Sequence, residues 1–138
     1  MVARKSGLVE NNWSGGKKEL RDWLNKRPGG ELEWQKLQGL VYGRYMSKAE
    51  MYPNVANFLL RCKRMNIELY IVSHKTEYGH FDADKVPMRK AAIKWMQSKG
   101  FFNEKKFGIS PKAIFFSNTR EEKVEKISDI PFFYTTSV

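Results

Sequence analysis

Two side chains that could bind an anion follow predicted strands of this chain. The apolar run Ile67–Val72 ends abruptly at Ser73, and Lys123 comes shortly after a second apolar run, Ala113–Phe116. Short apolar runs of this kind are typical of buried parallel strands, and ligands of α/β proteins bind at the carboxyl ends of such strands. We therefore expect the Ser73 hydroxyl, which can donate a hydrogen bond, and the Lys123 ammonium to lie at one edge of one sheet.

The elements that would position these two side chains alternate along the chain. Helices are predicted where apolar residues recur at helical spacing, and strands where short apolar runs occur. The helices are expected over 17–26, 31–42, 53–64, 87–99 and from 119 or 121 to 127, and the strands over 67–72, 113–116 and 130–134. This alternation predicts an α/β fold with a parallel sheet, in a single domain over residues 1–138 whose residues 1–16 are loose.

The composition limits the classes of protein to which the chain can belong. Its 138 residues suit one domain, and 41% hydrophobic content with 14% aromatics argues against disorder. Cys62 is the single cysteine, so no internal disulfide forms, and we expect it to be a buried, inert thiol. No apolar run suits a membrane helix and no signal-peptide core follows Met1, which predicts a cytoplasmic protein with no membrane partner.

The chain is strongly basic, with 25 Lys and Arg against 15 Asp and Glu and a net charge of +10. Basic surfaces concentrate anions, so a phosphate-bearing partner or nucleic acid fits this charge. The lysines are nevertheless scattered along the whole chain, and a solvated basic surface is the plainer interpretation.

The order of several short motifs resembles the haloacid dehalogenase-like (HAD) hydrolase superfamily over roughly residues 31–127. In that family the second motif is a strand ending in Ser or Thr, matched by Ser73, and the third is a Lys early in a later helix, matched by Lys123. The resemblance implies a Rossmann-type three-layer α/β/α fold, with residues 17–50 as a helical cap and residues 51–138 as a partial α/β core. The motifs that carry it are Gln38–Gly43, Tyr52–Pro53, Ser73–Thr76, Lys99–Phe102 and Thr119–Lys123.

The same resemblance implies roles for the side chains at the strand ends. Ser73 would hydrogen-bond a phosphoryl oxygen, and Lys123 would place a positive charge against the nucleophile and the phosphate, so these two would be the catalytic residues. The implied reaction is Mg²⁺-dependent hydrolysis of a small phosphorylated substrate through an aspartyl-phosphate. Ser73 would also bind the substrate, together with four neighbouring candidates: His74, Lys75, Thr76 and Arg120.

Two parts of the family pattern are missing. No apolar strand ending in the Asp-x-Asp nucleophile motif precedes Ser73, and Asp82-Ala83-Asp84 follows the second motif within a loop, so we do not expect it to be catalytic. The acidic residues that hold Mg²⁺ should end a strand after the Lys123 helix, whereas Asp129 precedes that strand. The chain is therefore expected to be a truncated or degenerate member that is catalytically incomplete and has no metal site of its own.

The missing strand leaves other interpretations open. In the family that strand pairs with the Ser73 strand, so its loss would leave an edge open to a partner chain or to self-association. Without the resemblance, Ser73 would simply bond its own loop and Lys123 would be an exposed lysine beside Glu122. The alternative function is a non-catalytic basic module that binds nucleic acid or a protein partner through the aromatic residues among its lysines, which are Trp13, Trp23, Trp34 and Tyr45.

Overall fold

The computed structural model describes residues 2–79 and 84–130. Strands β1 (Ile71–His74) and β2 (Ile114–Ser117) pair in parallel, so the described chain is mixed α/β. No helix in these two ranges is long and apolar enough to cross a membrane. The helices are α1 (Val2–Lys5), α2 (Lys17–Asn25), α3 (Gly30–Tyr42), α4 (Val55–Arg64), α5 (Met88–Ser98) and α6 (Arg120–Asp129), and the short 3-10 helices are η1 (Met46–Lys48) and η2 (Pro111–Ala113).

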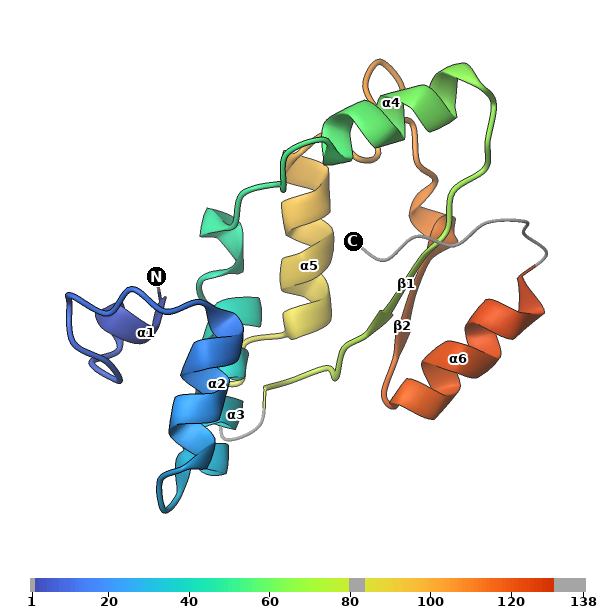
Figure 1. The fold of residues 1–138 in the computed structure, drawn as a ribbon. Helices are drawn as coiled ribbons and strands as arrows, with labels where there is room; N and C mark the ends of the chain where they lie inside the picture. Colours follow the sequence, from blue (N-terminus) through green and yellow to red (C-terminus); the bar gives the residue numbers. More distant parts are fainter. Residues whose placement is uncertain (1, 80–83, 131–138) are drawn as a thin grey trace.

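The two strands lie between α5 and α6 (Figure 1). Ile71 pairs with Ile114 and His74 with Ser117, and this pair is the whole sheet within the described ranges. Successive side chains of a strand point to opposite faces. Ile71, Ile114 and Phe116 pack on the core that includes α5, so this parity marks the α5 face of the sheet. The opposite parity, which includes Phe115, marks the face covered by α6, because the Lys126 ammonium of α6 lies 3.9 Å from the Phe115 ring centre.

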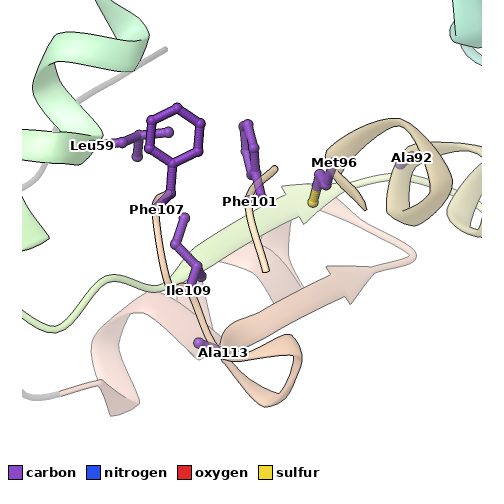
Figure 2. Packing of buried hydrophobic residues seen from close by; sticks show 7 residues of the cluster. All are labelled: Leu59, Ala92, Met96, Phe101, Phe107, Ile109 and Ala113. Atoms are coloured by element: carbon purple, nitrogen blue, oxygen red, sulfur yellow. The ribbon is translucent and has the colours of Figure 1, made fainter. Parts of the chain in front are cut away.

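The main core lies between α4, α5 and the α5 face of the sheet. Helix α5 contributes Ala92 and Met96 to this core, and Met88 is buried on the same face of the helix, since the three recur every fourth residue. Two aromatic residues from the loop after α5, Phe101 and Phe107, fill the space between the helices and the strands (Figure 2). The buried members of this core are Leu59, Ala92, Met96, Phe101, Phe107, Ile109 and Ala113.

A second cluster joins the N-terminal helices and differs from the loose N-terminus that the sequence predicts. Ala3 of α1 is fully buried, and its carbonyl accepts hydrogen bonds from the amides of Leu8 and Val9. These apolar residues are isolated within a polar stretch, so their spacing gives no periodic signal. They become buried because α2 and α3 provide an apolar surface, in a cluster formed by Ala3, Val9, Leu20, Leu24, Trp34 and Leu37.

The predicted helices over 17–26, 31–42, 53–64, 87–99 and from 119 or 121 to 127 are confirmed with small shifts at their ends. Strand β1 begins at Ile71 and not at Ile67, because β2 offers its first partner, Ile114, only there. The strand expected over 130–134 lies outside the described residues, apart from Ile130. Cys62 is 6% exposed, which confirms that it is a buried thiol.

Candidate functional site

The carboxyl ends of the two strands lie side by side. After β1 ends at His74, the Lys75 amide donates to the Ser117 carbonyl at 3.0 Å, so the parallel pairing continues beyond the strand. Segment 73–76 therefore lies next to segment 117–119, which leads directly into α6. This arrangement brings both strand-end segments of the predicted site to one edge, called the carboxyl edge below.

Ser73 lies on the α5 side of the carboxyl edge. It pairs with Phe116, and the alternation of the strand gives it the same face as Ile71, which packs on the α5 core. Ser73 is half-buried, and its hydroxyl has no hydrogen-bond partner among residues 2–79 and 84–130. The interpretation in which this hydroxyl bonds its own loop is therefore not supported in the described part of the chain, and the group remains available to a ligand oxygen.

The first turn of α6 is fixed by its own side chains. Thr119 Oγ1 accepts a hydrogen bond from the Glu122 amide at 3.1 Å, and a Glu122 carboxylate oxygen accepts one from the Asn118 amide at 2.8 Å. This is a capping-box arrangement in which the carboxylate reaches one residue further out than usual. It explains why α6 begins at Arg120, and it holds Asn118 in place at the carboxyl edge.

Replacing Thr119 by alanine is expected to lower the free energy of unfolding by about 1 kcal/mol, because the Glu122 amide loses its capping partner. Urea denaturation measures the change. Thr119→Ser is the matched control, since it keeps the hydroxyl and should retain most of the stability. Equal losses in both variants would mean that the cap contributes little.

Lys123 and Arg120 lie on α6, which covers the opposite face from Ser73. Lys123 is half-buried at the fourth residue of α6, and its backbone amide donates to the Thr119 carbonyl at 3.2 Å. Arg120, the first residue of the helix, is exposed. Since α6 lies on the Phe115 side of the sheet, the Lys123 ammonium and the Ser73 hydroxyl can meet only over the carboxyl edge. That Ser73 and Lys123 line one pocket therefore stays a prediction, and it requires the Lys123 side chain to reach over the carboxyl edge.

Arg89, near the start of α5, ties the two strand-end loops together. Its Nε donates to the Lys75 carbonyl at 2.8 Å and its Nη2 donates to the Asn118 side-chain oxygen at 2.6 Å. Its guanidinium carbon lies 5.9 Å from the Phe116 ring centre, and Phe116 is the strand partner of Ser73. The motif comparison gives no role to this arginine. From the sequence it is one of two arginines, with Arg120, that could reach an anionic substrate, although a surface salt bridge is the commoner fate of such a residue.

Lys75 extends toward the helical N-terminal part of the chain. Its ammonium lies 4.1 Å from the centre of the Tyr42 ring at the end of α3, which packs against α5. Burial lowers the pKa of the Lys75 ammonium below the ordinary value of 10.5. Two residues after Tyr42, Arg44 forms an ion pair with Asp84. The segment expected to act as a cap therefore touches the carboxyl edge through Tyr42.

His74 and Thr76 are held by backbone partners. His74 Nε2 lies 3.0 Å from the Asn118 carbonyl oxygen, and the Thr76 hydroxyl donates to the Tyr78 carbonyl at 2.7 Å. Both contacts shape the loops at the carboxyl edge. They leave Ser73, Lys75 and Arg89 as the side chains of this edge best placed on the α5 side for an anion.

The described carboxylates do not form a Mg²⁺ site. No group of three or more His, Cys, Asp or Glu side chains comes together in residues 2–79 and 84–130. Asp84 pairs with Arg44, and Asp129 ends α6, at the opposite end of that helix from the carboxyl edge. Asp82 lies outside the described residues. The carboxylates in the described part of the chain therefore do not fit the Mg²⁺ ion that the family resemblance implies.

No family model, no curated protein and no solved structure matches the chain.

Proposed function

We propose that the chain is a phosphate-binding α/β domain of the HAD-like phosphohydrolase type, which takes a small phosphorylated ligand at the carboxyl edge. The observation that carries this proposal is the hydrogen bond from the Lys75 amide to the Ser117 carbonyl, because it joins the Ser73 loop to the loop that begins α6. The Ser73 hydroxyl, which has no partner among the described residues, and several cations then lie toward one edge of a parallel sheet. Ligands of open α/β sheets bind at such edges.

The proposed parent architecture is a three-layer α/β/α fold whose parallel sheet has more strands than β1 and β2. In HAD-like sheets the nucleophile strand lies beside the second-motif strand. Within the described residues β1 has a neighbour on one edge only, so a further strand could pair on its outer edge. A partner chain or a second copy of this chain would supply that strand, which gives the proposal its partner.

Hydrolysis is not expected of the chain by itself. No apolar strand ending in Asp-x-Asp precedes Ser73, and the described carboxylates do not fit Mg²⁺, so we assign no step to a metal. Ser73 would donate a hydrogen bond to a phosphoryl oxygen. Lys123 and Arg120 would supply positive charge over the edge from the α6 side.

Inorganic phosphate is expected to bind the chain, and both Ser73→Ala and Lys123→Ala should weaken binding about tenfold, the loss typical of a hydrogen bond to a charged group. Isothermal titration calorimetry at fixed ionic strength measures the affinities. Lys126→Ala is the matched control, because it removes one charge from the same helix and its ammonium lies over Phe115. Equal weakening by Lys123→Ala and Lys126→Ala would reduce the effect of Lys123 to general charge.

The same samples, assayed with an aryl phosphate in the presence and absence of Mg²⁺, separate binding from catalysis. We expect no release of phosphate. Mg²⁺-dependent turnover that Lys123→Ala abolishes would contradict the catalytically incomplete form of the proposal and would make Asp82 the first candidate nucleophile.

A basic binding module is the second candidate, and one surface favours it. Trp13 and Trp23 line an open hollow of about 500 Å³ beside α2, and the Arg27 guanidinium lies 4.5 Å from the Trp23 ring centre. Trp34 is only 7% exposed and Lys17 and Arg21 cover its ring, so it offers little surface for a stacked base. Affinity for an oligonucleotide that falls steeply with salt, together with no binding of phosphate, would favour this candidate.

A further inference from the structure

The Lys75 ammonium is a partly desolvated cation, and no carboxylate among residues 2–79 and 84–130 forms an ion pair with it. The ion pairs within residues 2–79 and 84–130 are Arg27 with Glu33 and Arg44 with Asp84, so Lys75 belongs to neither. Its contact is the face of the Tyr42 ring at 4.1 Å, which attracts a cation less strongly than a carboxylate does. Burial of a charge without a counterion costs free energy. An anion that binds beside the ammonium stabilises its charged form and offsets that cost.

Arg89 presents a second cation on the same side of the sheet. Two of its five N–H donors hold the Lys75 carbonyl and the Asn118 side chain, and no carboxylate of the described residues pairs with it. Asn118 is itself held in place, because its backbone amide donates to the Glu122 carboxylate at 2.8 Å. The guanidinium is thus oriented before any ligand arrives, which lowers the entropy lost when a ligand binds.

Ser73 shares the α5 face with both cations. Its strand partner Phe116 lies under the Arg89 guanidinium, and the Lys75 side chain reaches α3, which packs against α5. Lys123, by contrast, reaches this region only over the carboxyl edge from α6. The structure therefore gathers one hydroxyl, one ammonium and one guanidinium on a single side of the sheet.

We propose that Lys75 and Arg89, with the Ser73 hydroxyl, form the subsite that holds the phosphoryl oxygens of the ligand, on the α5 side of the carboxyl edge. This inference rests on the proposed phosphate-binding function and names the residues that carry it. Arg89 recognises the oxygens through its planar set of donors, and Lys75 supplies a charge that has lost much of its water.

Phosphate binding at this subsite has a signature in the ionisation of Lys75. The free protein holds its pKa below 10.5 through burial, and an adjacent phosphate favours the charged form, so binding raises the pKa and takes up a proton. Affinity should therefore fall as the pH rises through the lowered pKa of Lys75. The ionisable groups joined to Lys75 or its loop are Tyr42 on α3, Arg89 on α5, and the chain neighbours His74 and Glu77.

The test uses inorganic phosphate and the whole chain. Lys75→Met, which keeps the length of the side chain, should weaken phosphate binding about tenfold, as expected for a charge-assisted contact, while Lys94→Met should leave it nearly unchanged. Lys94 is the matched control, because it lies exposed on α5 and its loss changes the net charge equally. Arg89→Lys, which keeps the charge but cannot bridge the two loops in the same way, should also weaken binding.

A second measurement does not depend on any variant. The ¹³Cε resonance of Lys75 in the wild-type chain reports its pKa, which should move up toward 10.5 when phosphate saturates the protein. Phosphate binding that Lys75→Met and Lys94→Met weaken equally, or that leaves the Lys75 titration unchanged, would overturn the subsite and leave the proposed function standing. A wild-type chain that binds no phosphate would overturn both.

Discussion

Replacing Gly30 by alanine is expected to lower the free energy of unfolding by about 3 kcal/mol or more, at the upper end of overpacking effects. A methyl group at Gly30 would lie 1.7 Å from the Leu24 carbonyl oxygen and 2.5 Å from its carbon. Both atoms belong to the backbone of α2, and Leu24 is fully buried, so neither can move aside alone. The first turn of α3 would have to separate from the last turn of α2. Urea denaturation followed by tryptophan fluorescence measures the loss.

Gly29→Ala is the matched control for this prediction. Gly29 has φ +73°, and nothing lies within 4 Å of an added methyl group, so this variant carries only the strain of a left-handed alanine, about 1–2 kcal/mol. Gly30→Ala should be the less stable of the two. A Gly30→Ala chain as stable as Gly29→Ala would show that the two helices do not pack as closely as the structure indicates.

Phe101→Ala is expected to lower the free energy of unfolding by about 3–5 kcal/mol, as large aromatic truncations in cores do. Phe101 is 6% exposed, and its ring forms edge contacts with Trp95 at 5.6 Å and Phe107 at 5.8 Å between ring centres. Its backbone also joins the end of α5 to the segment before β2, through the Met96 carbonyl and the Ile109 amide. Backbone relaxation around the resulting cavity is therefore restricted. Thermal and urea unfolding check the value.

Phe58→Ala tests whether the effect of Phe101 comes from burial. Phe58 is the same residue type on α4 but is 40% exposed, so its truncation should change the stability by about 0.5 kcal/mol or less, like other surface substitutions. Comparable losses at the two positions would contradict the assignment of Phe101 to the core. Because α5 carries Arg89, a loss of this core should also disturb the carboxyl edge.

Local patterns in the sequence were sufficient for most of the elements. The spacing of Met88, Ala92 and Met96 predicts α5 with its buried face, and the apolar runs predict the two strands. The spacing of apolar residues within one helix or strand marks its buried face, whichever other element packs against that face. The buried position of Ala3 and the late start of β1 were not predictable, because each depends on a partner distant in the chain.

The sequence by itself determined the mixed α/β class and the position of Ser73 at a strand end, since both follow from the order of apolar runs and polar residues along the chain. Only the tertiary structure decided which charged groups share a side with Ser73. Helix α5 carries Arg89 on the Ser73 face of the sheet and the Lys75 side chain reaches Tyr42 of α3, whereas α6 carries Lys123 on the other face. The physical reason is that strand alternation and helix packing assign side chains to faces, and that assignment depends on the three-dimensional pairing of distant segments.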